Sequence, residues 1–277
     1  MSAPDIHTTR WGTSGPPVVM VHGSAQGSRV GGDGHFAAQQ RLAERGWQVL
    51  VPDRPGHGRS PAPGRPDDAE LDAVWLAEML AELPSKLPTE GAHLVGHSFG
   101  ACVALAAAAR RPQSVRSLTL IEPGMQKLAT HDPRVRRFGM QLLAVKYLSL
   151  SAASRARRFA QLVGIPPEIG ASKSTDELTR MGQGILALRV PSAQTLVRQL
   201  LALKQAAIPL LVVSGGWNPA FEATADAVAA AGNGQRRVIA CPHHFPQSVS
   251  DEFNQVLAAF MVQSDAARAD RASASPA

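Results

Sequence analysis

A serine flanked by glycines stands where a predicted strand turns into a predicted helix. The stretch is Gly96-His97-Ser98-Phe99-Gly100, which follows the apolar run 92–95 and precedes the alanine-rich run 101–111. Glycines on both sides of the serine allow a turn so tight that the hydroxyl is exposed above the sheet. A strand, this turn and a helix are what a nucleophile elbow requires. The pattern therefore predicts Ser98 as a catalytic nucleophile.

A base must lie near this serine, because a serine hydroxyl is a poor nucleophile until its proton is removed. The base is commonly a histidine held by a carboxylate, and an elbow architecture has the chain order serine, acid, histidine. Two adjacent histidines, His243 and His244, follow the last predicted strand. Because Phe-Pro and then a helix follow His244, we predict His244 as the base and keep His243 as the alternative.

The acid has two candidate positions. The commonest is the loop after the penultimate strand, where the stretch 214–219 carries Asn218 in place of an aspartate. An amide can orient a histidine but does not stabilise the imidazolium that forms. The other position is the end of the strand that follows the elbow helix, where Glu122 supplies a carboxylate. We therefore predict Glu122 as the acid and keep Asn218 as the alternative.

The oxyanion of a tetrahedral intermediate needs two N–H donors. One is the backbone amide of Phe99, directly after the predicted nucleophile. The other is expected in the loop after the first long core strand, where Gly23 permits close approach of the backbone and Ser24 supplies the amide. The turn-rich stretch 53–60 precedes the nucleophile, so its Asp and His are expected to fix loops by hydrogen bonds rather than to join the triad.

Alternating strands and helices are predicted to position these groups. Helical spacing of apolar residues marks the stretches 70–83 and 250–262. Continuous apolar runs are typical of strands buried on both faces, and they occur at 17–21, 47–51, 92–95, 115–121 and 209–214, before a short final strand at 237–240. Strands that alternate with helices imply an α/β fold with a mostly parallel sheet.

The pattern changes between residues 125 and 207, where helical spacing persists without a convincing strand. We expect this insertion to form a helical cap over the active site, and its apolar composition points to an apolar or bulky substrate. The predicted division is a core of 1–124 and 208–263, a cap of 125–207 and a disordered tail of 264–277, which is rich in Ala, Ser, Asp and Arg.

The composition restricts the partners. Of the 277 residues, 44% are hydrophobic and 18% are charged, which is typical of a globular protein. No apolar run approaches the roughly 20 residues that a membrane span needs, and residues 1–5 do not begin a secretory signal. The net charge of +6 includes basic clusters at 134–137 and 155–158, interpreted as solvated helix faces. We predict a cytoplasmic protein without nucleic-acid or membrane partners, without cofactor or metal, and leave a homodimer open.

Together these motifs resemble the α/β-hydrolase fold superfamily. The matching pieces are His22-Gly23, the stretch 53–60, the elbow 96–100 and His244-Phe245-Pro246, in the expected order between residues 16 and 262. The resemblance implies an eight-stranded, mostly parallel sheet flanked by helices, with a helical cap inserted after strand six. The chain departs from the family's pattern at Asn218, where an aspartate is usual.

A glutamate after strand six is found in a minority of that superfamily. At Glu122-Pro123 and at residues 244–246 the chain is similar to the fungal zearalenone lactonases, which are serine hydrolases of this kind. Haloalkane dehalogenases also carry a glutamate there, but their nucleophile is an aspartate, and Ser98 argues against their chemistry.

The resemblance and the residues together predict a cofactor-independent serine hydrolase that acts through an acyl-enzyme. The predicted substrate is a small molecule, an apolar or bulky carboxylic ester or lactone. Hydrolysis of a carbon–carbon bond in a ring-cleavage diketone uses the same fold and the same triad, and it stays an alternative. A ligand receptor without catalysis is a third possibility, which the set of Ser98, Glu122 and His244 argues against.

Overall fold

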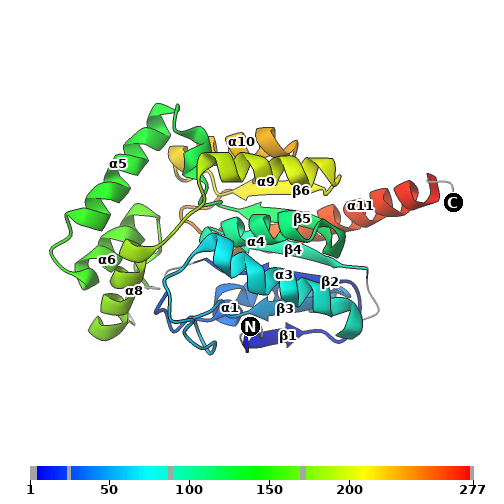
Figure 1. Cartoon of the computed structure of the whole chain (residues 1–277), viewed down its shortest axis with the longest axis horizontal. Coiled ribbons are helices and arrows are strands. Elements are labelled where there is room, and N and C mark those ends of the chain that lie inside the picture. The colour runs from blue at the N-terminus through cyan, green and yellow to red at the C-terminus, as the bar shows by residue number, and fades with distance from the viewer. Residues whose placement is uncertain (1–4, 24–25, 87–89, 169–172, 275–277) are drawn as a thin grey trace.

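The computed structural model describes residues 5–23, 26–86, 90–168 and 173–274, and a seven-stranded sheet runs through this part of the chain (Figure 1). The strand order is β1-β3-β2-β4-β5-β6-β7. The strands are β1 (Thr8–Trp11), β2 (Pro17–Val21), β3 (Gln48–Pro52), β4 (Ala92–His97), β5 (Val115–Ile121), β6 (Leu210–Ser214) and β7 (Gln235–Val238). Only β1 pairs antiparallel, with β3, and all other pairs are parallel. The predicted α/β class with a mostly parallel sheet is confirmed.

The sheet has one strand fewer than the resemblance implied, so the helical insertion follows the fifth strand of the described chain rather than the sixth. The sequence analysis also missed β1, because its residues are half-exposed at the edge of the sheet and form no apolar run. By contrast, every residue of β2, β3, β4 and β6 is buried, which is why their apolar runs were visible in the sequence.

Helices cover both faces of this sheet. They are α1 (Gly32–His35), α2 (Arg41–Glu44), α3 (Ala69–Lys86), α4 (Phe99–Arg110), α5 (Pro133–Tyr147), α6 (Ala152–Leu162), α8 (Thr175–Ala187), α9 (Ala193–Gln205), α10 (Pro219–Gly232) and α11 (Glu252–Ala274). Short 3-10 turns occur at η1 (Ala37–Gln40), η2 (Pro112–Ser114), η3 (Gln126–Ala129) and η4 (Pro246–Ser248).

The two faces bury separate apolar cores because successive side chains of a strand point to opposite faces. Val19 and Val21 of β2 face the core that α3, α4, α9 and α10 cover. Val18 and Met20 face the second core, where Phe253 of α11 packs. With an apolar side chain on each face at nearly every position, the central strands are fixed in register, and their carboxyl ends are held at one edge.

The segment between β5 and β6 divides into two parts. Figure 1 shows α5, α6 and α8 grouped at the left, away from the sheet, where α6 and α8 pack on each other. In contrast, α9 packs on α4 and α10, and its Leu196, Leu200 and Leu203 belong to the core of the sheet. The helices therefore lie where helical spacing predicted them. The division into a core and a cap at residues 125 and 207 stays a prediction, and α9 packs with the sheet.

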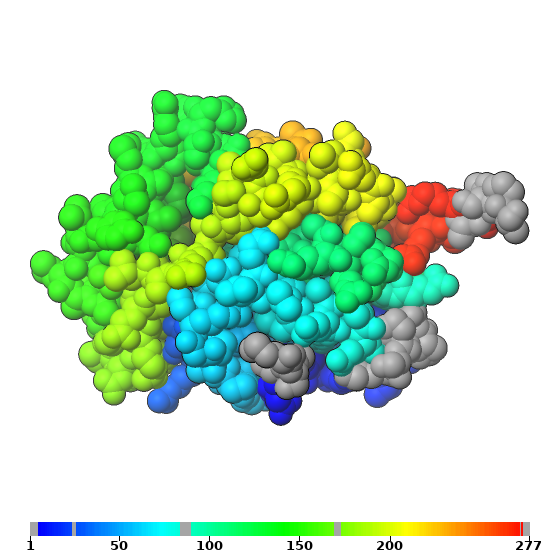
Figure 2. All heavy atoms as spheres, in the orientation of Figure 1, coloured from blue at the N-terminus to red at the C-terminus, as the bar shows by residue number. Residues whose placement is uncertain are grey.

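The expectation of a disordered tail from Ser264 is wrong for the described residues up to 274, because α11 continues as a helix to Ala274. Asp265 in this part of α11 forms an ion pair with Arg116 of β5 at 2.8 Å. The end of α11, drawn in red, projects beyond the rest of the molecule in Figure 2. Composition alone missed this helix because alanine, arginine and aspartate in the tail are compatible with both states.

No helix in the described ranges is both long enough and apolar enough to cross a membrane.

Candidate active site

Ser98 sits on a tight turn between β4 and α4. Its backbone has φ 56° and ψ −120°, a conformation that residues with a side chain rarely adopt. The flanking glycines make this turn possible: a Cβ on Gly96 would lie 2.6 Å from the carbonyl oxygen of Gly100, and one on Gly100 would lie 2.3 Å from that of Val21. The close approach of helix and strand thus explains why both elbow positions are glycine.

Three backbone hydrogen bonds hold the serine in place. Its N–H donates to the carbonyl oxygen of Ile121 at 2.9 Å, and its own carbonyl oxygen accepts from the N–H groups of Ala101 and Gly124, both at 3.1 Å. Ser98 is therefore tied to the end of β5 as well as to its own helix. The amide of Phe99 begins α4, and the first amides of a helix have no acceptor within the helix.

Glu122 follows β5 directly and lies next to the elbow in the sheet. Its backbone also has a positive φ, 45°, and its N–H donates to the carbonyl oxygen of Val213 at 2.8 Å. The side chain is fully buried, and Oε1 accepts a hydrogen bond from the N–H of Gly215 at 2.6 Å. Burial raises the pKa of this carboxyl to about 7, although the hydrogen bond from Gly215 acts in the opposite direction.

His244 lies against this carboxylate. Its Nδ1 is 3.4 Å from Oε2 of Glu122, and the ring is buried between the aromatic ring of Phe221 and the ring of His97, each 4.8 Å away between centroids. Neither ring nitrogen has a hydrogen-bond partner among the described residues. Burial lowers the pKa of His244 to about 3, so the ring is neutral near pH 7 and one of its two nitrogens is available to accept a proton.

The alternative candidates point elsewhere. The Nδ1 atom of His243 is 3.1 Å from Sγ of Cys241 and accepts a hydrogen bond from the N–H of Phe245. The side chain of Asn218 accepts from the N–H of Ala220 at 2.9 Å and caps α10. The structure thus brings Glu122 and His244 together and assigns helix capping to Asn218.

The second oxyanion donor proposed in the sequence analysis, Ser24, lies outside the described residues. The preceding His22-Gly23 is described, and a Cβ on Gly23 would lie 2.8 Å from Cβ of Ser98. The backbone after β2 therefore passes directly beside the elbow, and this close approach requires a glycine at position 23.

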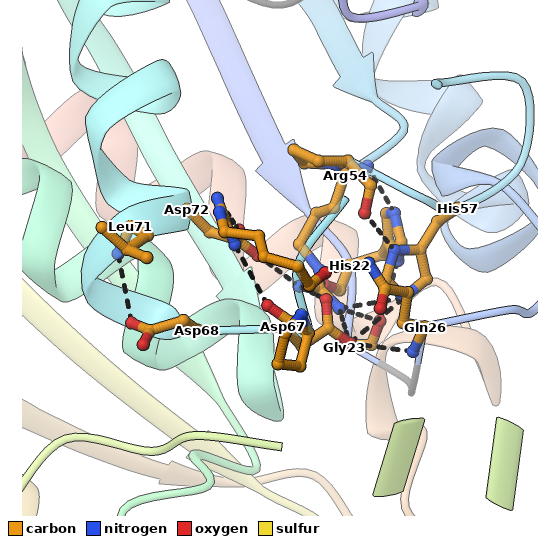
Figure 3. A network of polar contacts seen from close by, with 12 residues as sticks. His22, Gly23, Gln26, Arg54, His57, Asp67, Asp68, Leu71 and Asp72 are labelled. Carbon is orange, nitrogen blue, oxygen red and sulfur yellow. Dashed lines mark hydrogen bonds and ion pairs between the residues drawn. The ribbon is translucent and has the colours of Figure 1, made fainter. Parts of the chain in front are cut away.

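A buried arginine that the sequence analysis did not single out supports this loop. Figure 3 shows Arg54 among His22, Gly23, His57, Asp67 and Asp72. The side-chain Nε of Arg54 donates to the carbonyl oxygen of His22 at 3.1 Å, and the backbone N–H of Arg54 donates to Nε2 of the His22 ring at 2.9 Å. Its Nη1 pairs with Asp67 at 3.1 Å and with Asp72 at 2.8 Å. Burial of a charge with two carboxylates is sustained only by such complete pairing.

The same guanidinium lies 4.6 Å from the ring centroid of Phe99. Arg54 therefore contacts both Phe99 and the described part of the loop after β2, His22-Gly23. Its position within the stretch 53–60 agrees with the expectation that this stretch fixes loops. The carboxylates of Asp67 and Asp72 carry no signal in the sequence, because their partner is defined only by folding.

A second missed residue is His35 of α1. Its Nε2 lies 2.7 Å from Nδ1 of His97, and Nε2 of His97 lies 2.8 Å from the carbonyl oxygen of His244. Burial lowers the pKa of both His35 and His97, so the two rings are neutral near pH 7. This chain of contacts fixes the backbone that carries His244.

Ser98, Phe99, His97 and His244 line one large cavity of 1220 Å³ between the edge of the sheet and the insertion helices. The far walls come from α5, α6 and α8 and are mostly apolar, including Phe138, Leu142, Phe159, Leu178 and Met181. A serine, a neutral buried histidine and a carboxylate behind it, all beside an apolar cavity, can carry out acyl transfer on a large apolar molecule.

Comparison with known proteins gives the family and two relatives. The model of the alpha/beta hydrolase fold family matches residues 16–251. Lipase LipV of Mycobacterium tuberculosis is 30% identical over 194 residues, which are 67% of this chain and 67% of that protein. The 2-hydroxymuconate semialdehyde hydrolase of a Pseudomonas strain is 37% identical over 109 residues, which are 39% of this chain and 36% of that protein.

Among solved structures, a loop variant of the haloalkane dehalogenase DbeA from Bradyrhizobium elkanii superimposes with a TM-score of 0.71. The match covers 98% of each chain at 20% sequence identity, so this likeness concerns the fold.

Proposed function

The chain belongs to the alpha/beta hydrolase fold family, and on this premise we propose that it is a cofactor-independent serine hydrolase of a carboxylic ester or lactone. The observation that carries the proposal is one arrangement: Ser98, on its positive-φ turn, lines the same cavity as His244, and Nδ1 of His244 is 3.4 Å from Glu122. The names of relatives include a lipase, which agrees with ester cleavage.

In the proposed reaction, Nε2 of His244 takes the hydroxyl proton as Oγ of Ser98 attacks the carbonyl carbon. The amide of Phe99 and that of Ser24 bind the oxygen that becomes negative. Glu122 stabilises the imidazolium, which then gives its proton to the leaving alkoxide. Water attacks the acyl-enzyme with the same help from His244, and Ser98 regains its proton as the acid leaves.

The unpartnered Nε2 of His244 supports its role as base. A buried ring nitrogen without a hydrogen bond among the described residues has an unfavourable environment until a donor arrives. Catalytic hydrogen bonds are often absent or long in a free enzyme and tighten only in the substrate complex. We expect a substrate that excludes water from the cavity to bring Ser98 and His244 into hydrogen-bond contact.

Hydrolysis of a carbon–carbon bond is the second candidate, because a relative named 2-hydroxymuconate semialdehyde hydrolase is 37% identical over part of the chain. The same histidine and serine could serve that reaction. Comparison of kcat/KM for ring-cleavage diketones with kcat/KM for esters and lactones of similar size separates the two candidates.

A fluorophosphonate probe tests the proposed nucleophile. We expect the wild type to be labelled and the Ser98→Ala variant to remain unlabelled, with loss of hydrolysis of short p-nitrophenyl esters. The adduct should map to the peptide that contains Ser98. A folded wild type that is neither labelled nor active on esters would overturn the proposal and favour a ligand receptor.

A further inference from the structure

We propose that the cavity contains an anion-binding subsite formed by Lys146 and Lys127, and that the substrate carries a carboxylate at the end remote from the bond that is cleaved. The inference rests on the proposed function and adds a substrate class to it.

The wall of the cavity carries only one sign of charge. None of its described lining residues is an aspartate or a glutamate, although six are cationic. The six are Lys127, Arg136, Lys146, Arg157, Lys173 and Arg189. An apolar cavity whose wall carries only positive charges raises the local concentration of anionic ligands. The positive potential therefore favours a substrate that combines apolar surface with negative charge.

Two of the six cations have carboxylate partners within the protein. Lys173 pairs with Glu177 at 2.9 Å, and Arg189 lies 3.9 Å from Asp68. For the other four, Lys127, Arg136, Lys146 and Arg157, no carboxylate lies within 4.0 Å among the described residues, and Lys146 is the least exposed of them. Lys127 and Lys146 are therefore better placed than Lys173 and Arg189 to bind an external anion.

Lys146 differs from the exposed cations because its side chain is half-buried, in the last turn of α5. Its place near the helix end is favourable for a cation through the helix dipole. The helix dipole does not explain why the Lys146 side chain lines an apolar cavity without a carboxylate. An ammonium group removed from water without a counter-charge is unfavourable, and an anionic ligand would relieve that cost.

Lys127, in the short turn η3, lines the same cavity as Lys146. Burial lowers the pKa of Lys146, and the charge of Lys127 acts in the same direction. The Nζ atom of Lys127 donates to the carbonyl oxygen of Val190 at 3.2 Å, and Val190 also lines the cavity. An anion in this cavity can be attracted by both ammonium groups, which would offset the repulsion between them. Lys146 belongs to α5 of the insertion, whereas Ser98 reaches the same cavity from the end of β4.

The chemistry of the ligand follows from this arrangement. A half-ester of a dicarboxylic acid fits this arrangement. Its ester carbonyl would lie at Ser98, its apolar middle section along the walls of α5, α6 and α8, and its terminal carboxylate at Lys146. Because Ser98 and Lys146 are fixed to different elements, one chain length should fit best.

The first experiment compares pairs of substrates. Mono-p-nitrophenyl esters of dicarboxylic acids of increasing length are matched with the same esters methylated at the free carboxylate. We expect the wild type to prefer the charged member about tenfold or more in kcat/KM, as a charge-assisted contact would give, with one optimal length and a preference that weakens as salt is added.

In the Lys146→Met variant this preference should fall about tenfold, mainly through KM. Arg137→Met is the matched control, because Arg137 is an exposed cation of the same helix that does not line the cavity. A wild type without preference, or an equal loss in Arg137→Met, overturns the subsite.

The second experiment does not need catalysis. Calorimetric titration of the Ser98→Ala variant with the monomethyl ester of octanedioic acid should show binding that the dimethyl ester lacks, and Lys146→Met in the same background should remove the difference. If this charge preference is present while Ser98 in the wild type is not labelled by the fluorophosphonate, the proposed function fails and the subsite stands. If labelling succeeds and the preference is absent, the subsite fails alone.

Discussion

At the scale of single residues, the positions proposed for nucleophile and acid share an uncommon backbone conformation. Among the described residues other than glycine, φ is positive at Ser98, Glu122, Ala207 and Asn233. Asn233 caps the end of α10, and Ala207 follows the end of α9, where such a conformation is common. Ser98 and Glu122 instead follow the adjacent parallel strands β4 and β5. Backbone strain of this kind is concentrated at functional sites.

The acid assignment is tested with two substitutions. In Glu122→Gln the buried carboxylate becomes neutral, and we expect kcat/KM to fall about 10⁴-fold, as when the acid of a triad is made an amide. Asn218→Ala should change kcat/KM little and should lower the free energy of unfolding by about 1 kcal/mol through loss of the α10 cap. Equal, small losses of activity in both variants would contradict the role of Glu122.

The pH dependence of the wild type follows from the same pair. For catalysis, Glu122 must be ionised and His244 neutral, with the one ring proton of His244 on Nδ1 and with Nε2 free to accept. Burial raises the pKa of Glu122 to about 7, so the pair takes up its proton as the pH falls through that value. We expect kcat/KM to decline below about pH 7 and the residual activity of Glu122→Gln to persist to lower pH. Similar pH profiles for the two proteins would disagree with this assignment.

Stability should show the opposite sign. The folded-state pKa of Glu122, about 7, lies above its ordinary value of 4.5, so folding favours the protonated carboxyl. The free energy of unfolding therefore falls as the pH rises from about 4.5 to about 7. Glu122→Gln avoids this cost, and we expect it to be more stable than the wild type at about pH 8, by at most about 3 kcal/mol.

Thermal unfolding of both proteins at about pH 5 and about pH 8 measures this effect. The gain in melting temperature from the substitution should be larger at the higher pH. An equal gain at both pH values would show that ionisation of Glu122 is not its cause.

At the scale of elements, one arginine connects the loops that surround the site. Arg54 follows β3 and contacts His22 after β2, Asp67 before α3, and Asp72 within α3. The guanidinium is fully buried, and so are both carboxylates. The loop beside the elbow is therefore held by a charge network rather than by apolar packing, which permits a shape that a strand or helix would not provide.

Removal of this arginine should be costly. Arg54→Met leaves the buried Asp67 without its arginine and Asp72 with Arg65 alone, and we expect a loss of about 3–5 kcal/mol in the free energy of unfolding. Arg45→Met is the control, since Arg45 forms an exposed ion pair with Asp251 and such pairs contribute about 0–1 kcal/mol. Urea denaturation measures both, and similar losses would show that the network does not carry this stability.

At the scale of the whole molecule, α11 packs against the amino ends of the central strands β4 and β5, away from the site. Asp265 of α11 pairs with Arg116 at 2.8 Å and lies 3.3 Å from Nε2 of His93. Residues beyond Arg268 are exposed where their burial is described. The helix therefore contributes to the fold through 264–268, although its composition resembles that of a flexible tail.

Truncation tests this division of α11. A chain that ends at Gln263 loses the contacts of Asp265, and we expect its free energy of unfolding to fall by about 1.5–3 kcal/mol. A chain that ends at Arg268 keeps them and should match the full chain within about 0.5 kcal/mol. Thermal and urea unfolding distinguish the two, and equal stability of both truncated chains would show that 264–268 contribute nothing.

What the sequence determined by itself is local or periodic. The elbow at Ser98 is contiguous, so its glycines and its flanking strand and helix are visible together. The buried strands are continuous apolar runs, and their alternation with helices predicted the α/β class. The half-exposed edge strand β1 and the helical end of α11 have no such run. The strand was therefore not predicted, and the end of the helix was predicted to be disordered.

Tertiary structure alone decided which side chains meet. His243 and His244 are neighbours in the chain, and only the path of the loop turns His244 toward Glu122 and His243 toward Cys241. Contact between Arg54 and Asp72, and the opening of Lys146 into a cavity without carboxylates, likewise depend on packing between distant segments. Such contacts form only when the sheet brings those segments together, because sequence spacing carries no information about the direction of a side chain in a loop.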